Sequence, residues 1–145
     1  TAFVGKSVKY ILDKIGITVG DDVKVILMEA KEDHPFVQVE LMMPILPVVR
    51  VPDVDQAIEM AVRVEHGNRH TAMMHSRNVE KLTKMAKLIQ TTIFVKNGPS
   101  YAGIGVGGEG YTTFTIAGPT GEGLTSAKSF ARRRRCVLVG GMDVR

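Results

Sequence analysis

Two polar residues stand where the surrounding sequence asks for a chemical explanation. Glu40 lies among apolar residues in the segment Val37 to Pro44, so its carboxylate is either exposed by a turn or retained for a purpose. His70 lies in the turn that leads into an expected strand, and its ring could transfer a proton there. Because such turns lie at the opposite end of a parallel sheet from the usual ligand-binding edge, this position alone does not make His70 catalytic.

The glycines from Gly103 to Gly108 match the spelling G-x-G-x-x-G of a dinucleotide-binding fingerprint. That fingerprint places its glycines directly after a strand and at the start of a helix, whereas about seven residues separate these glycines from the preceding expected strand. The residues that follow, Glu109 to Thr113, are a poor helix start. We therefore predict a glycine-lined loop beside a site, within the turn-rich stretch 98–123.

Other reactive residues give weaker signals. None of the four histidines has the spacing of a helix-borne zinc site, and no metal is expected; His66 is read as solvated and His75 as structural. Cys136 is the only cysteine, which excludes an intramolecular disulfide and favours a packed thiol. The run Arg132 to Arg135 could bind phosphates, but strand alternation would divide it between two faces, so a solvated or subunit-facing edge strand is expected.

Composition bounds the class of protein. The chain has 145 residues, of which 44% are hydrophobic and 23% charged, as in one globular domain rather than a disordered chain. No apolar run approaches the ~18 residues of a membrane span, no signal peptide is recognisable, and a cytoplasmic setting is the default. The net charge of +4 suits a polyanionic partner. The chain opens without methionine in an amphipathic segment, so we expect a piece of a longer polypeptide.

The elements that must position these residues alternate between helices and strands. In chain order we expect a helix at 5–16, a strand at 23–28, a strand at 48–51, a helix at 53–67 capped by Asp53 with Gln56, a strand at 71–75, a helix after Ser76 or Asn78, and strands at 92–95 and 130–139. The short connections predict a parallel sheet with right-handed crossovers, and therefore an α/β fold.

Several uncommon strings of residues match one known family. They are His34 to Val37, Glu40-Leu41-Met42-Met43-Pro44, His70-Thr71-Ala72, His75-Ser76-Arg77-Asn78 and Ile93 to Ser100. With these strings in order, the chain resembles the C-terminal part of the CoA-acylating aldehyde dehydrogenases, in particular the propionaldehyde and acetaldehyde dehydrogenases of bacterial microcompartments. The resemblance implies an aldehyde dehydrogenase-like α/β fold with a parallel strand–helix–strand core. Residues 1–129 would be the C-terminal part of the catalytic domain, and residues 130–145 an oligomerisation strand and tail.

The same resemblance implies roles for single residues. Glu40 would bond the nicotinamide ribose hydroxyls of NAD, with Met42 beside it in the cofactor site. His70 would help deprotonate the thiol of coenzyme A or support the tetrahedral intermediate. The aldehyde pocket, a weaker assignment, would be lined by Asn97, Ser100, Ile104 and Gly105.

The implied activity is the conversion of a short-chain aldehyde, propionaldehyde or acetaldehyde, with CoA and NAD to acyl-CoA and NADH through a cysteine thioester. In the family the nucleophilic cysteine lies upstream of the segment that resembles residue 1, so we expect a fragment that is inactive alone. Its implied partners are the rest of the polypeptide and further copies in a homo-oligomer, without nucleic acid or membrane, in the cytoplasm or a bacterial microcompartment. The alternatives are a non-catalytic CoA- or nucleotide-binding α/β module and, through its arginine run, a nucleic-acid binder.

Overall fold

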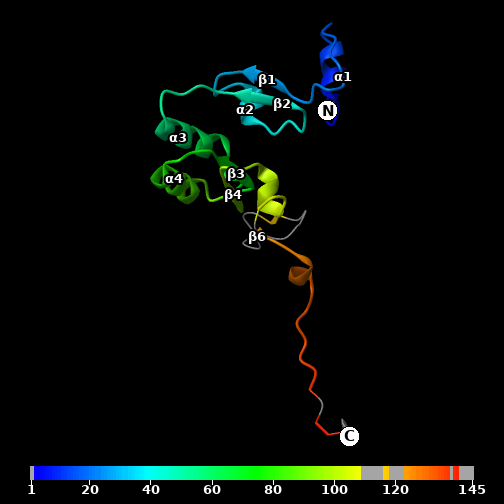
Figure 1. Cartoon of the computed structure of the whole chain (residues 1–145), viewed down its shortest axis with the longest axis vertical. Helices are drawn as coiled ribbons and strands as arrows, with labels where there is room; N and C mark the ends of the chain where they lie inside the picture. Colours follow the sequence, from blue (N-terminus) through cyan, green and yellow to red (C-terminus); the bar gives the residue numbers. More distant parts are fainter. Residues whose placement is uncertain (1, 109–115, 118–122, 138, 141–145) are drawn as a thin grey trace. The chain divides into compact units, whose positions relative to one another are not determined.

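The computed structural model describes residues 2–108, 116–117, 123–137 and 139–140 (Figure 1). The chain divides into two compact units, one made of residues 1–67 and 78–89 and the other of residues 68–77 and 90–145. Each unit contains a pair of parallel strands, which agrees with the α/β fold predicted from the sequence. Within the described residues, no helix combines the length and the apolar character that crossing a membrane requires.

The first unit contains four helices and two strands among its described residues. In chain order they are α1 (Val8–Asp13), β1 (Ile26–Glu29), α2 (Pro35–Gln38), β2 (Ile45–Val48), α3 (Val54–Val64) and α4 (Val79–Ile89).

The parallel pair of β1 and β2 forms the sheet of this unit (Figure 1). Ile26 lies opposite Ile45 and Glu29 opposite Val48. The short helix α2 lies between the two strands in sequence and begins at Pro35, where a missing backbone donor costs nothing. Glu40 lies in the connection between α2 and β2, so these two elements fix the two ends of that connection.

The caps of the two longer helices follow from their polar first residues. Asp53 caps α3 as predicted, since its carboxylate accepts a hydrogen bond from the Gln56 amide over 2.9 Å. The Gln56 side chain donates to the same carboxylate over 3.0 Å, in place of the backbone contact of a full capping box. At the start of α4, Asn78 accepts from the Lys81 amide over 3.0 Å, which selects Asn78 over Ser76 as the cap.

An ion-pair cluster links α3 to α4. The Asp55 carboxylate accepts bonds from the ammonium group of Lys81 over 2.7 Å and from that of Lys84 over 2.8 Å. These two lysines, Lys81 first, lower the pKa of Asp55 to about 2. The apolar faces of the same helices supply most of the buried side chains of the unit, which include Ile58, Leu82, Met85 and Ile89.

The second unit is built on another parallel pair. Its described elements are β3 (Thr71–Met74), β4 (Ile93–Lys96), the 3-10 helix η1 (Ser100–Ile104), β5 (Ile116–Ala117), β6 (Gly123–Leu124) and the 3-10 helix η2 (Ala127–Phe130). Thr71 lies opposite Ile93 in the β3–β4 pair, whereas β5 and β6 run antiparallel. The side chains of Ile93 and Val95 are buried, so β4 is the apolar centre of this unit.

The structure corrects two expectations about strands. The strand expected at 48–51 lies at 45–48 and pairs with β1, so the described strands form separate pairs instead of one continuous sheet. The segment from Ile45 to Val51 is apolar except for Arg50, so its residue types suit a strand at either end, and pairing with β1 selects its first half. Residues 131–137 of the expected last strand are neither strand nor helix, because a strand needs a hydrogen-bonded neighbour. The division at residue 129 and the oligomerisation role remain predictions.

Candidate functional site

The segment from Glu40 to Pro44 is a partly exposed connection that is held at one point by the start of the chain. The amide of Gly5 donates to the carbonyl oxygen of Met42 over 3.0 Å, and the carbonyl of Pro44 then accepts from Ile26 over 2.8 Å. Met42 has a φ of 51°, in the left-handed region that a methionine adopts only under such local constraint. The Glu40 carboxylate therefore projects from a connection whose shape is fixed two residues further on.

Glu40 and Met42 both present their side chains to solvent within this unit. Glu40 is exposed, and no described residue donates a hydrogen bond to its carboxylate. The Met42 side chain is 71% exposed, although it is large and apolar. The exposed carboxylate can accept hydrogen bonds from the donors of a ligand, and Met42 offers an apolar surface two residues further along the chain.

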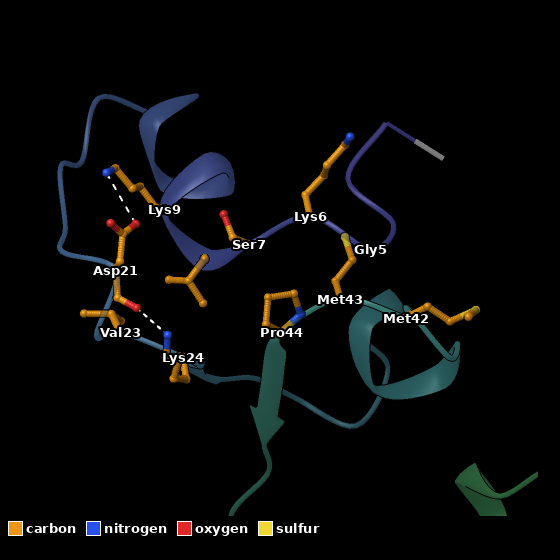
Figure 2. A pocket seen from close by; sticks show the side chains of 11 residues that line it. Gly5, Lys6, Ser7, Lys9, Asp21, Val23, Lys24, Met42, Met43 and Pro44 are labelled. Carbon is orange, nitrogen blue, oxygen red and sulfur yellow. Dashed lines mark hydrogen bonds and ion pairs between the residues drawn. The ribbon is translucent and has the colours of Figure 1, made fainter. Parts of the chain in front are cut away.

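A cavity of ≈ 580 Å³ lies beside this connection (Figure 2). Met42, Met43 and Pro44 border it on one side, and the beginning of α1 with the segment at 21–24 borders it on the other. At the far rim, Lys9 pairs with the Asp21 carboxylate at 3.4 Å and Lys24 donates to the Asp21 carbonyl (Figure 2). Sequence reasoning missed this cavity, because its two walls lie far apart along the chain.

His70 lies immediately before β3 in the second unit. Its carbonyl accepts from the Ile93 amide over 3.2 Å, which places it at the amino end of the β3–β4 pair. The ring is exposed, and Nδ1 lies 2.7 Å from the Thr71 hydroxyl oxygen. This contact restrains the orientation of the imidazole relative to the strand.

Asn97 lies at the other end of the same strand pair. It follows β4 directly, and its amide donates to the Met74 carbonyl over 3.0 Å. Its side chain accepts from the Ser76 amide over 2.7 Å and donates to the Ser76 carbonyl over 2.9 Å. At ~3.3 Å per residue, the strands separate Asn97 from His70 by about 15 to 20 Å, so these two predicted site residues do not form one cluster.

The 3-10 helix η1 carries Ser100 and Ile104 and returns along β4. A Cβ atom on Gly103 would lie only 2.2 Å from the Ile93 Cγ2, so the backbone of η1 approaches the amino end of β4 closely. Gly105 follows with a φ of 91°. The helix thus extends from the Asn97 end of the strand pair toward the His70 end, and the predicted pocket residues are spread along it.

The position of Gly103 inside η1 also shows that the glycine motif is not a dinucleotide-binding fingerprint. A dinucleotide fingerprint needs glycines between a strand and a helix start, but Gly103 lies inside η1 against β4, and Gly105 has a φ of 91° directly after η1. These glycines therefore lack the setting of the fingerprint, and the predicted glycine-lined loop beside a site stays a prediction. The rest of the glycine-rich stretch lies largely outside the described residues, from 109 to 115 and from 118 to 122.

The remaining candidates have local roles in the described chain. His34 caps α2 by accepting from the Phe36 amide, and the His66 ring pairs with the Gln38 side chain at 2.9 Å. Among the described residues, no three His, Cys, Asp or Glu side chains come together as metal ligands. Cys136 is exposed, which contradicts the packed thiol expected from the sequence, because the strand that was to bury it does not form in this chain.

The two groups of predicted residues belong to different units. Glu40 and Met42 lie in the first unit, whereas His70, Asn97, Ser100, Ile104 and Gly105 lie in the second. Ser76 was missed as a partner of Asn97. The dipeptide Asn97-Gly98 after a strand, typical of a tight turn, was the available signal.

Comparison with known proteins places this arrangement in a class. The sequence profile of the aldehyde dehydrogenase family matches residues 24–122, more than half of the chain. The chain therefore belongs to the aldehyde dehydrogenase family. This confirms the family and the fold that the sequence predicts.

Individual relatives lie within a narrower group. The chain is 56% identical over 143 residues to a CoA-propanoylating propanal dehydrogenase of Salmonella typhimurium, which covers 98% of this chain and 31% of that protein. A crystal structure of Rhodopseudomonas palustris propionaldehyde dehydrogenase with bound propionyl-CoA is 73% identical, with a TM-score of 0.88 over 94% of this chain and 30% of that one. A propionaldehyde dehydrogenase from the Clostridium phytofermentans fucose utilisation bacterial microcompartment is 56% identical, with a TM-score of 0.85 over 93% of this chain and 31% of that one. The chain thus spans about 31% of the length of the curated relative named here.

Proposed function

We propose that this chain is part of an NAD-dependent, CoA-acylating aldehyde dehydrogenase that converts propionaldehyde or acetaldehyde to the acyl-CoA. The observation that carries the proposal is the 56% identity, over 98% of the chain, with a CoA-propanoylating propanal dehydrogenase. The propionyl-CoA in the Rhodopseudomonas palustris structure supports the same substrate class. The nucleophilic cysteine belongs to the part of the polypeptide outside this chain.

The described residues of the first unit suit a nicotinamide nucleotide. The Glu40 carboxylate is exposed and accepts no bond from any described residue, so it can accept two from vicinal ribose hydroxyls. Met42 offers an exposed apolar surface two residues away for the nicotinamide ring. NAD supplies the hydride acceptor of the reaction when bound. Glu40 and Met42 would hold its nicotinamide end, Glu40 by accepting hydrogen bonds and Met42 by apolar contact.

His70 acts in the second half of the reaction. In the first half, a cysteine thiolate outside this chain attacks the aldehyde carbonyl, and loss of hydride leaves an acyl thioester. His70 then takes the thiol proton of CoA on its imidazole, which the Thr71 hydroxyl contacts at Nδ1. The CoA sulfur attacks the thioester carbonyl, and the enzyme cysteine leaves as a thiolate. Ser100, Ile104 and Gly105, with the Asn97 turn, line the aldehyde pocket along η1.

The remaining partners are further copies of the same polypeptide. The described tail exposes three apolar side chains, Phe130, Val137 and Val139, which supports pairing of residues 130–145 with another subunit. The homo-oligomer would lie in the cytoplasm, within a bacterial microcompartment like that named for the Clostridium relative. Native mass measurement of the longer polypeptide should give an oligomer, and deletion of residues 130–145 should shift the mass toward the monomer. An unchanged oligomer would contradict this assignment.

The test separates the two halves of the reaction in the full-length polypeptide that carries this sequence. With aldehyde and NAD alone, the wild type should release about one NADH per active site, and CoA should then restore turnover. His70→Ala should keep the first burst and lower turnover by about 10²–10⁴-fold. Glu40→Gln should slow the burst and lower kcat/KM for NAD by about 10- to 100-fold.

Matched variants of exposed residues control for nonspecific damage. His75→Ala changes a histidine at the far end of β3, and Glu80→Gln changes a carboxylate in the first turn of α4. Both should retain wild-type kinetics. Equal losses in His70→Ala and His75→Ala, or no acyl-CoA from the wild type, would contradict the proposed function.

A second candidate, a binding module without chemistry, applies to the chain alone. Its single cysteine lies in segment 131–137 after η2, so the chain offers no cysteine within either group of candidate residues. Equilibrium dialysis of the isolated 145 residues against NAD and against CoA distinguishes the two readings. The binding module would be favoured if the isolated chain bound NAD or CoA tightly and the source cells contained no longer polypeptide with this sequence.

A further inference from the structure

The Asn97 side chain prolongs the β3–β4 ladder by one residue. Its carbonyl oxygen accepts from the Ser76 amide over 2.7 Å, and its amino group donates to the Ser76 carbonyl over 2.9 Å. A carboxamide has the same donor and acceptor as a peptide group, so it can replace a backbone unit in such a pair. Ser76 is thereby bonded on both of its backbone groups by one side chain.

The backbone of Asn97 explains why a side chain is needed there. Its φ of 55° lies in the left-handed region, which asparagine tolerates better than most residues. This conformation turns the main chain out of the strand direction directly after its amide has bonded the Met74 carbonyl over 3.0 Å. The backbone cannot continue the ladder beyond this residue, and the carboxamide continues it instead.

Two connections leave the strand pair at this point. One is residues 75–78, which ends at the cap of α4, and the other turns through Gly98 into η1. A Cβ atom on Gly98 would lie 3.4 Å from Val95 and 3.7 Å from Ala102, so the second connection folds directly back onto β4. The bonds between Asn97 and Ser76 hold the starts of both connections at a fixed separation.

We propose that Asn97 is a positioning residue, which sets the loops at 75–78 and 98–104 through Ser76 and does not itself contact the aldehyde. The inference rests on the proposed function for the consequence in catalysis, since Ser100 and Ile104 line the aldehyde pocket there. The hydrogen bonds on which it stands need no ligand. They can be tested whether or not the protein makes acyl-CoA.

Three substitutions in the full-length polypeptide separate the backbone of Asn97 from its carboxamide. Asn97→Gly keeps the left-handed backbone accessible and removes the side chain. Asn97→Asp keeps an acceptor for the Ser76 amide and removes the donor to its carbonyl. Asn97→Ala removes the carboxamide and also strains the backbone. Asn78→Gly is the matched control, because it removes another asparagine side chain, the α4 cap, and glycine is well tolerated at a helix N-cap.

The first measurement is hydrogen–deuterium exchange at the Ser76 amide. We expect exchange to rise about five- to tenfold in Asn97→Gly, less in Asn97→Asp, and not at all in Asn78→Gly. Unchanged exchange at Ser76 in Asn97→Gly would overturn the proposal. This readout requires no activity, so it fails separately from the proposed function.

The second measurement is the steady-state kinetics of the same variants. We expect Asn97→Gly to raise the KM for propionaldehyde and acetaldehyde by one common factor of about five to ten, while kcat changes less than twofold. Asn97→Asp should recover part of the loss. A fall in kcat in Asn97→Gly with wild-type exchange at Ser76 would indicate direct contact with the reacting carbonyl, and would contradict the positioning role.

Discussion

The backbone amide of Gly5 donates a hydrogen bond to the carbonyl oxygen of Met42 over 3.0 Å. Through this bond, the segment before α1 fixes the connection that carries Glu40. Gly5 has a φ of 69°, and a Cβ atom there would meet nothing within 4 Å. The position therefore demands glycine for its backbone conformation and not for lack of space.

We expect Gly5→Ala to raise the KM for NAD about fivefold in the full-length enzyme, because ~1–2 kcal/mol of backbone strain favours release of this bond. Gly5→Asn should have a smaller effect, since asparagine tolerates the left-handed region. Initial rates at varied NAD measure both variants. An alanine variant with the wild-type KM for NAD would show that the bond does not hold the Glu40 connection in place.

Thr71 orients His70 through the 2.7 Å contact between its hydroxyl oxygen and Nδ1. We expect Thr71→Val to slow acyl transfer to CoA about fivefold and to leave the NADH burst intact, because one hydrogen bond of ~1 kcal/mol is lost only from the second half of the reaction. Thr71→Ser retains the hydroxyl and should retain the rate. If valine and serine behave alike, the hydroxyl contact has no role in orienting the imidazole.

The pair of lysines around Asp55 makes the link between α3 and α4 dependent on pH. Since these contacts lower the folded-state pKa of Asp55 from 3.8 to about 2, their stabilisation is complete above the unfolded value and is lost as the pH falls from about 4 toward 2. Thermal midpoints of the wild type and of Asp55→Asn should differ at neutral pH and converge at about pH 2. Asp13→Asn, at the exposed end of α1, serves as the control and should follow the wild type. If the difference in thermal midpoint between the wild type and Asp55→Asn stayed constant from neutral pH to about pH 2, the ion pairs would not be its cause.

Gly103 permits η1 to lie against β4. We expect Gly103→Ala to destabilise the protein by about 1–3 kcal/mol, because the added Cβ would lie 2.2 Å from Ile93 and must displace η1 or the strand. Gly98→Ala is the matched control, since its closest contact is an ordinary 3.4 Å to Val95. Urea unfolding compares the two. If the two variants lost the same free energy of unfolding, the structure would accommodate a Cβ atom at Gly103 without destabilisation.

Much of the fold follows from local patterns in the sequence. The caps at Asp53 and Asn78 and the apolar faces of α3 and α4 predict both helices, and the short segments between and after these helices predict β3 and β4. The pairing of β2 with β1 was not predictable, because Ile45 to Val51 is apolar except for Arg50 and only a partner strand selects the register.

The candidate site was less accessible to sequence reasoning. Glu40 and His70 were singled out because their types are unusual in their surroundings, and a family resemblance supplied their roles. The hydrogen bond from Gly5 to Met42 joins residues 37 positions apart, and the pair of hydrogen bonds between Asn97 and Ser76 joins residues 21 positions apart. No local sequence pattern reveals contacts at such separations. Cys136 was wrongly predicted to be packed. The prediction relied on a strand at 130–139, which does not form without a neighbouring strand, and Cys136 is exposed.

The central claim is tested most directly by NADH and acyl-CoA formation from the full-length polypeptide and from the 145-residue chain, with propionaldehyde, NAD and CoA. We predict CoA-dependent turnover for the full-length wild type, an NADH burst followed by turnover about 10²–10⁴-fold slower for its His70→Ala variant, and no NADH from the isolated chain. Turnover by the isolated chain, or a full-length enzyme that oxidises the aldehyde without forming acyl-CoA, would contradict the account.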